Sequence, residues 1–183
     1  MIKLELSEKV GELEQIVALQ RLNRPGAVTA DERDTEGFLT MEYTVRELQL
    51  MRGGYRHVVA KSDDAVIGYA LVMLTESRAS FPFLETMFRD AEAAVFNDKP
   101  MRENSYFVMG QICVGREFRG MGVFRKLYET LRMQMHADFD FVVTEVSVHN
   151  ARSMRAHQRV GFREITNVHA DASEWRVIVW DWS

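Results

Sequence analysis

The spacing of hydrophobic residues divides this chain into stretches with the period of a strand and stretches with the period of a helix. Residues 141–148 form a near-continuous β-branched run, which is typical of a central strand. Other short apolar runs predict strands at residues 2–6, 57–61, 65–74, 106–114 and 175–182. Ser62-Asp63-Asp64 has turn composition, so the second and third of these runs are expected to form a hairpin.

Between these strands, helical spacing of apolar residues predicts helices at residues 7–22, from 44 onward, and at 82–95, 122–136 and 150–160. Ser7 is the expected N-cap of the first helix, whose core face would carry Val10, Leu13, Ile16 and Val17. Thr44-Val45-Arg46-Glu47 has the form of a capping box, and Gly161 is expected to close the last helix.

The order of these elements predicts one mixed α/β domain over residues 1–183. Antiparallel strands come first and two β–α units follow, which favours a mostly antiparallel sheet of six to seven strands flanked by helices. With 183 residues, 46% of them hydrophobic, the chain can bury one core. Residues 23–40 are polar and contain Arg24-Pro25-Gly26, so they are read as a loop of the kind that often carries function.

Composition narrows the classes of function. A net charge of −4 disfavours broad binding to nucleic acid or to an anionic membrane surface. The single cysteine, Cys113, excludes an internal disulfide framework and a multi-cysteine zinc site, and the histidines show no metal-ligand pattern. No apolar run approaches the ~18 residues of a membrane span, and the first residues lack an apolar signal core. We therefore expect a soluble, cytoplasmic protein without a metal.

The turn Arg119-Gly120-Met121-Gly122 joins the strand at 106–114 to the helix that follows it. Two glycines at such a junction let backbone N–H groups converge on one point, and the helix adds its own unpaired N–H groups and the positive end of its dipole. The turn is therefore a candidate phosphate cradle. Taken alone, it is equally well explained as a tight structural turn.

The second half of the chain favours the cradle. The succession of strand, glycine turn, helix, strand, asparagine and helix resembles the GNAT superfamily of N-acetyltransferases. The phosphate motif of that family, Q/R-x-x-G-x-G/A, has Arg119 and Gly122 at its first and fourth positions. A second family block, roughly N-x-x-A/S-x-x-x-Y-x-x-x-G-F, is matched at the family's spacing by Asn150, Ser153, His157, Gly161 and Phe162.

The resemblance implies acetyl-CoA as the cofactor and transfer of its acyl group to a primary amine. It places the pyrophosphate on the backbone of Arg119, Gly120, Met121, Gly122, Val123 and Phe124. It also implies splayed central strands, with the cofactor's pantetheine arm bound by Ile112, Cys113, Val114, Asn150 and Ser153. Phe124 departs from the family, which prefers Gly or Ala there, so its side chain must point away from the pyrophosphate and toward the core.

A second departure is His157, which stands where the family often has a tyrosine that protonates the leaving thiolate. Histidine has an ordinary pKa near ~6.5 and is a candidate for that acid; the alternative is a helix histidine bonded to a backbone carbonyl. Glu145, on the predicted central strand, is the candidate base, because a carboxylate among valines is not expected for packing alone. The alternative for Glu145 is a structural pair with an arginine.

The acceptor site is less defined by the sequence. Glu42, Tyr43 and Gln111 are candidate contacts to a small-molecule or peptide amine; for the first two the alternative is plain surface. Cys113 is a much weaker candidate, as an acyl-enzyme nucleophile, than as a small core residue. The arginines Arg152, Arg155, Arg159 and Arg163 form either a solvated face or contacts to an outer phosphate.

Two alternatives accompany this interpretation. The same fold could serve as a non-catalytic acyl-CoA-binding module. A different nucleotide-binding enzyme would be expected to carry a Walker lysine or a G-x-G-x-x-G fingerprint, and neither is present.

Exposed aromatic side chains at Trp175, Trp180 or Trp182 would support a homodimer, whereas core packing is the other explanation for them.

Overall fold

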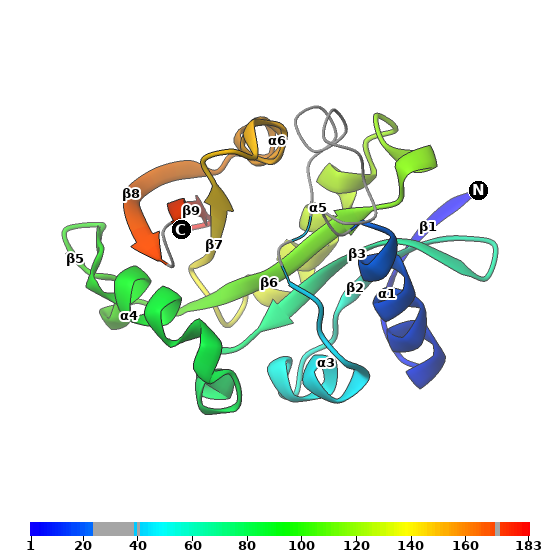
Figure 1. Ribbon diagram of the computed structural model, residues 1–183, viewed down its shortest axis with the longest axis horizontal. Helices are drawn as coiled ribbons and strands as arrows, with labels where there is room; N and C mark the ends of the chain where they lie inside the picture. The colour runs from blue at the N-terminus through cyan, green and yellow to red at the C-terminus, as the bar shows by residue number, and fades with distance from the viewer. Residues whose placement is uncertain (24–38, 40, 171–172) are drawn as a thin grey trace.

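A seven-stranded sheet in the order β1-β2-β3-β6-β7-β9-β8 forms the centre of the molecule, which is known here from a computed structural model (Figure 1). The structure describes residues 1–23, 39, 41–170 and 173–183. The predicted polar loop at residues 23–40, with Arg24-Pro25-Gly26, lies almost wholly outside these ranges.

The first half of the sheet is antiparallel. It consists of β1 (Ile2–Leu6), β2 (Val58–Ser62), β3 (Ala65–Met73) and β6 (Tyr106–Val114). The hairpin between β2 and β3 forms as predicted, and Asp63 in its turn has φ of +53°. In the second half, β7 (Phe141–Ser147) lies parallel to β6, and β9 (Ser173–Asp181) and β8 (Arg163–Ala170) complete the sheet as antiparallel neighbours. The predicted mixed, mostly antiparallel sheet is confirmed.

Helices cover both faces of the sheet. One face packs against α1 (Val10–Leu22), α3 (Val45–Met51) and α4 (Glu85–Ala93), and the other packs against α5 (Val123–Met135) and α6 (Ala151–Val160). Each face has its own apolar cluster, the first built around residues such as Ile16 and Leu71 and the second around Leu127 and Val142. Between β3 and β6 the chain also forms short 3-10 turns and a small hairpin of β4 (Val95–Phe96) and β5 (Lys99–Pro100).

The start of α1 differs from the prediction. Ser7 is not the N-cap, because its backbone N–H bonds the carbonyl of His57 and the helix begins only after Lys9. The Glu12 carboxylate instead accepts hydrogen bonds from the backbone N–H groups of Glu8 (2.7 Å) and Lys9 (3.1 Å). Val10, expected on the core face, is 53% exposed, whereas Leu13, Ile16 and Val17 are buried as predicted.

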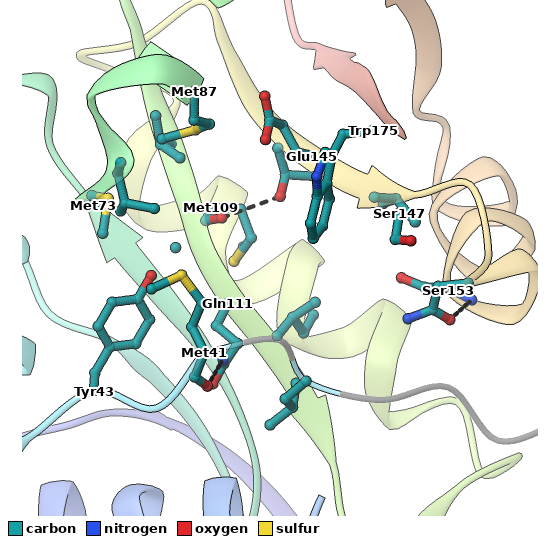
Figure 2. A pocket seen from close by; sticks show the side chains of 18 of the residues that line it. Met41, Tyr43, Met73, Met87, Met109, Gln111, Glu145, Ser147, Ser153 and Trp175 are labelled. Carbon is teal, nitrogen blue, oxygen red and sulfur yellow. Dashed lines mark hydrogen bonds between the residues drawn. The ribbon is translucent and has the colours of Figure 1, made fainter. Parts of the chain in front are cut away.

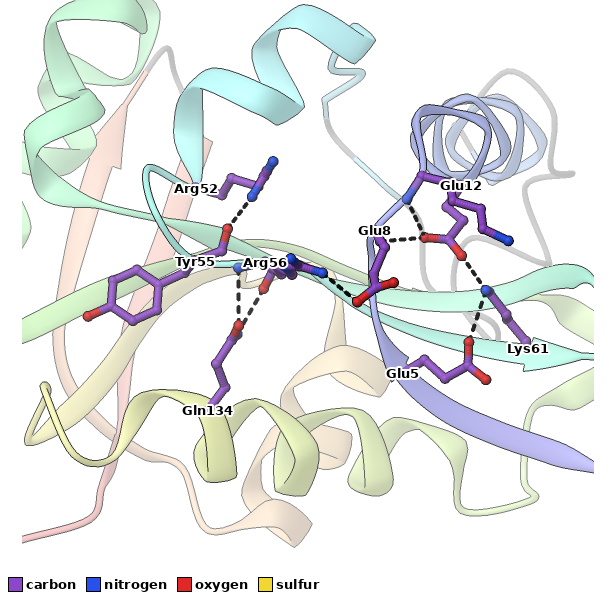
Figure 3. A network of polar contacts seen from close by, with 9 residues as sticks. Glu5, Glu8, Glu12, Arg52, Tyr55, Arg56, Lys61 and Gln134 are labelled. Atoms are coloured by element: carbon purple, nitrogen blue, oxygen red, sulfur yellow. Dashed lines mark hydrogen bonds and ion pairs between the residues drawn. The ribbon is translucent and has the colours of Figure 1, made fainter.

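The carboxylate of Glu12 belongs to a polar network that joins α1 to the edge of the sheet (Figure 3). The ammonium group of Lys61 bonds both Glu12 and, at 3.0 Å, Glu5. Arg56 is tied through its backbone to the side chain of Gln134 on α5 and through its guanidinium to Glu8 at 2.7 Å. This network fixes β1 and α1 against the strands that precede the site.

The capping box at Thr44 and the end of the last helix at Gly161 are confirmed, whereas the helix predicted at 82–95 is shorter, at Glu85–Ala93. The Thr44 hydroxyl accepts from the N–H of Glu47 at 3.3 Å, and the Glu47 carboxylate accepts from the N–H of Thr44 at 2.7 Å. Gly161 ends α6 with φ of +128°. Within the described ranges, no helix has the length and apolarity that crossing a membrane requires.

Candidate functional site

The central parallel pair of strands separates part of the way along its length. The β6–β7 ladder consists of Tyr106↔Phe141, Phe107↔Val142 and Val108↔Val143, although both strands continue well beyond these residues. Two cavities lie past the last pair: residues of both strands line the first, of about 360 Å³, and residues of β6 and α6 line the second, of about 640 Å³. The two cavities share the lining residues Leu39, Ile112, Asn150 and Ser153, so they meet in the gap.

Residues of the glycine turn, Arg119, Gly120 and Gly122, line the larger cavity. Gly120 and Gly122 have φ of +78° and +76°, which other residues adopt only with strain, and a Cβ built on either would meet open space. Gly122 is the N-cap of α5, so the first N–H groups of that helix, at Val123 and Phe124, lie beside the same cavity. Helix dipole and open backbone together suit an anionic group here.

Arg119 holds this turn in place. Its Nε donates to the carbonyl of Val114 at 3.1 Å, and one Nη donates to the Oδ1 atom of Asn23 at 2.7 Å. The side chain thereby connects the end of β6 to the end of α1, and it also lines the cavity. Met121, 58% exposed, does not line it and takes part only as backbone of the turn.

The side chain of Phe124 packs against other aromatic rings. Its ring packs against Tyr128 and His157, with ring centroids 5.3 Å and 5.1 Å away, in a cluster that continues to Phe162 and Trp180. The aromatic residue at this motif position is therefore accommodated by packing against these rings, at the border of the larger cavity.

Three arginines of α6 face the same cavity. Arg152, Arg155 and Arg159 line it, whereas Arg163 lies beyond the helix and pairs with Asp181 at 3.0 Å. Three guanidinium groups beside a helix N-terminus make this cavity strongly attractive to phosphates. Of the four arginines in the cluster, the first three therefore fit contacts to an outer phosphate, and the fourth does not.

Asn150 and Ser153 lie where the two cavities meet. Asn150 is the N-cap of α6, and its Oδ1 accepts from the N–H of Ser153 at 3.2 Å. Ile112, Cys113 and Val114 line the larger cavity from β6, so all five candidates for the pantetheine arm line this one cavity.

His157 is buried beneath Ser153, with 2% of its surface exposed. Its Nδ1 lies 2.8 Å from the carbonyl oxygen of Ser153, so Nδ1 carries the proton, and its Nε2 accepts from the hydroxyl of Tyr128 at 2.8 Å. Burial lowers the pKa of His157 to about 4, so the ring is neutral at physiological pH. The geometry matches the alternative of a helix histidine bonded to a carbonyl: the residue also lines the smaller cavity, but both of its ring nitrogens are already hydrogen-bonded within the protein.

The smaller cavity contains the candidate base. Glu145 lines it from β7, with Ser147 on the same side of the strand and Trp175 on the neighbouring strand beside them (Figure 2). Glu145 is half-buried and lies two residues past the point where the β6–β7 ladder ends. This places a carboxylate in the gap next to the residues shared by the two cavities.

Gln111 and Tyr43 also line this cavity, but Glu42 does not. The side chain of Gln111 accepts from the hydroxyl of Tyr69 at 2.5 Å and donates to the carbonyl of Met41 at 2.8 Å. The backbone of Tyr43 is held by both polar atoms of the Gln20 amide. Glu42 pairs with Arg21 of α1 at 2.8 Å and lies outside the lining, so it is not placed as an acceptor contact.

Cys113 has the environment of a core residue. It is 6% exposed, and burial raises the pKa of its thiol to about 12. A thiol that stays protonated at neutral pH is a poor nucleophile, so the structure favours the packing role over an acyl-enzyme.

Sequence reasoning missed several residues of the smaller cavity. Met41, Met73, Met87 and Met109 line it, together with Trp175, which was considered only for packing or dimerisation. The methionines come from four separate segments, so no local sequence spacing predicts that they line one cavity. Trp180 and Trp182, also considered for a dimer, are half-buried and pack on Tyr128 and Phe107.

Comparison with known proteins gives a consistent result. The model of the acetyltransferase (GNAT) family matches residues 13–162. A search of curated proteins found no match.

Solved structures of several acetyltransferases share the fold. The ribosomal-protein-S18-alanine N-acetyltransferase from Escherichia coli aligns with a TM-score of 0.65 at 12% identity, covering 100% of this chain and 95% of that one. NAA60 from Arabidopsis thaliana, solved with acetyl-CoA, has a TM-score of 0.65 at 14% identity and covers 99% of both chains. The yncA protein from Salmonella typhimurium, a putative acetyltransferase solved with its cofactor acetyl-CoA, has a TM-score of 0.59 at 15% identity, covering 100% of this chain and 94% of that one.

Proposed function

Because the chain belongs to the acetyltransferase (GNAT) family, whose members use acetyl-CoA, we propose that it transfers an acetyl group from acetyl-CoA to a primary amine. Both reactants are bound at the same time, and no acyl-enzyme forms. The observation that carries this proposal is the meeting of two cavities at the split between β6 and β7. One cavity suits a phosphate-bearing cofactor, and the other presents a carboxylate.

The residues of the larger cavity fit coenzyme A. The N–H groups of Gly122, Val123 and Phe124 would hold the pyrophosphate, and the arginines of α6 would neutralise its charge. The open backbone edge of β6 at Ile112 to Val114 would hold the pantetheine arm, as an added strand pairs with a sheet edge. When bound, acetyl-CoA supplies the activated thioester.

Glu145 is the base in this proposal. An aliphatic amine has a pKa near ~10 and is mostly protonated at neutral pH, so it must lose a proton before it can attack. The Glu145 carboxylate takes this proton, directly or through water, and lies in the cavity that would receive the amine. The C–N bond forms as the thioester C–S bond breaks, and the sulfur leaves as thiolate and takes up a proton, so acetylated amine and free coenzyme A result.

His157 positions other groups in this proposal and does not donate the final proton. Its bond to the Ser153 carbonyl fixes the first turn of α6, where Ser153 and Asn150 border both cavities. The thiolate of coenzyme A is compared with that of cysteine, whose thiol has an ordinary pKa near ~8.5, and so it can leave without a dedicated acid.

The replacement Glu145→Gln tests the proposal. We expect kcat to fall about 10²- to 10⁴-fold, the contribution of a positioned general base, because the amide cannot accept the amine proton. The Kd for coenzyme A, measured by isothermal titration calorimetry, should change less than about threefold, because the cofactor residues are intact.

The matched control is Glu14→Gln, on the exposed side of α1, which should leave both quantities unchanged. Equal turnover by the Glu145→Gln variant and the unaltered protein would remove Glu145 from the mechanism. Tight coenzyme A binding without thiol release from any amine would instead indicate a non-catalytic binding module.

A further inference from the structure

Large apolar side chains form much of the wall of the smaller cavity around one carboxylate, and neutral polar residues such as Gln111, Ser147 and Ser153 complete the lining. Met41, Met73, Met87 and Met109 approach it from four segments, and Tyr43 and Trp175 close two further sides (Figure 2). Among the described lining residues, Glu145 is the one carboxylate, and none is a lysine or an arginine. Burial raises the pKa of the Tyr43 phenol, so this group is neutral at physiological pH.

These walls are held by contacts that the proposed reaction does not need. The Gln111 amide fixes the Met41 carbonyl at 2.8 Å, and Met73 is fully buried in the centre of the sheet. Met87, on α4, is half-buried and packs against the apolar cluster of this face. The fold therefore sets where these methionines stand in the wall, while their unbranched side chains can adapt to guests of different shape.

From this lining we infer that the acceptor is a primary amine carried by a bulky, uncharged apolar group, such as an alkyl or arylalkyl chain. The inference rests on the proposed function, because it places the amino group at Glu145 and the apolar group among the methionines. The cavity volume of about 360 Å³ lies within the usual range for small-molecule sites. A second charged group on the acceptor would find no further charged side chain to pair with among the described lining residues, which makes its burial unfavourable.

Two sources can present this chemistry: a free apolar amine, or the N-terminus of a peptide whose first side chain is apolar. A panel of hexylamine, phenethylamine, 1,4-diaminobutane, ethanolamine, and short peptides beginning with Met or Asp separates them. Release of free thiol from acetyl-CoA gives kcat/KM for each acceptor.

If the acceptor is a free amine, we expect kcat/KM for hexylamine or phenethylamine to exceed that for 1,4-diaminobutane and ethanolamine at least tenfold. If it is a peptide, we expect kcat/KM for the Met peptide to exceed that for the Asp peptide at least tenfold. Apolar pockets discriminate by about 10- to 200-fold per methylene, so this margin is modest. Preference for 1,4-diaminobutane, ethanolamine or the Asp peptide would overturn the inference while leaving the proposed function standing. Failure of every amine, with coenzyme A still bound, would overturn the proposed function.

Replacement of one wall residue sharpens the test. Met87→Glu places a second carboxylate in the cavity, so we expect kcat/KM for the favoured apolar acceptor to fall at least tenfold and that for 1,4-diaminobutane to rise. Met133→Glu is the matched control, because Met133 is 69% exposed on α5 and lies outside both cavities.

A binding measurement gives a second readout that does not depend on turnover. Calorimetric titration of phenethylamine into the protein with coenzyme A should show binding that Met87→Glu weakens at least tenfold and Met133→Glu leaves unchanged. Equal effects of the two substitutions on binding and on kcat/KM would contradict an apolar acceptor site at Met87.

Discussion

His157 occupies a motif position where the GNAT family often has a tyrosine, yet both of its ring nitrogens are already bonded. The Nδ1 proton is directed at the Ser153 carbonyl, and Nε2 receives the Tyr128 hydroxyl proton. With its pKa lowered to about 4, the ring does not titrate near neutral pH. The sequence could place this side chain but could not predict its hydrogen bonds, because Tyr128 lies on a different helix.

We therefore expect His157→Phe to reduce kcat by less than about tenfold and to leave the shape of the pH–rate profile between pH 6 and 9 unchanged. A positioned general acid would contribute about 10²- to 10⁴-fold, and its removal would also abolish a limb of the profile. Steady-state kinetics across that range, with the melting temperature of the variant as a check on folding, decides between the two. Loss of a limb would restore His157 as the acid.

At other residues of the candidate site too, the sequence indicates which residues take part but not which contacts they make. The cofactor candidates could be located from spacing, because a glycine turn and a helix start are local features. Gln111, Tyr43 and Glu145 were proposed individually, and the fold brings these three to one cavity. Glu42 was proposed with them, but its pairing with Arg21 depends on how α1 packs and cannot be read from neighbouring positions.

Among the elements, the junction of β6 and α5 has the clearest functional consequence. Gly122 is both the N-cap of α5 and a residue with φ of +76°. A β-branched residue there adds left-handed strain of ~1–2 kcal/mol and moves the amides that follow it. We expect Gly122→Val to weaken coenzyme A binding at least tenfold, measured by calorimetry.

Gly54→Val is the control for that substitution, because Gly54 is exposed, has open space at its Cβ and is not among the positive-φ glycines of the described chain. It should leave coenzyme A affinity unchanged. Unaltered affinity in the Gly122 variant would contradict the assignment of this turn to the pyrophosphate.

Other elements show why sequence patterns fail where they do. β8 was missed because Arg163–Ala170 mixes charged, polar and apolar residues without clear alternation, and it is a strand because β9 pairs with it. The predicted start of the first helix is too early because serine is a common N-cap residue. In the structure the backbone of Ser7 still bonds His57, and the Glu12 side chain caps the helix. Both errors arise from partners distant in sequence, whereas the local capping box at Thr44 was predicted correctly.

For the whole molecule, two buried histidines predict sensitivity to acid. His57 donates from Nε2 to the Leu48 carbonyl and accepts at Nδ1 from the Val72 N–H, and burial lowers its pKa to about 4, as for His157. An unfolded histidine titrates near ~6.5, so as pH falls the unfolded state takes up protons first. Stability is therefore complete above pH ~6.5 and is lost as the pH falls toward 4.

Each histidine should contribute a loss of about 2–3 kcal/mol in the free energy of unfolding across that range. Urea denaturation at pH 7.0 and pH 4.5 measures it. His57→Gln keeps a donor for the Leu48 carbonyl but does not titrate, so the variant should show a smaller difference between the two pH values than the unaltered protein. An equal pH dependence in both would show that His57 is not a source of the acid sensitivity.

In the proposed reaction, Glu145 deprotonates the amine that accepts the acetyl group from acetyl-CoA held at the Gly122 turn. Single-turnover mass spectrometry of the acetylated amine, with saturating phenethylamine and with the unaltered protein beside Glu145→Gln, tests it most directly. We expect one acetylated amine for each coenzyme A released by the unaltered protein, and formation at least about 10²-fold slower in the variant. Equal rates of product formation in the two proteins, or thiol release without acetylated amine, would contradict it.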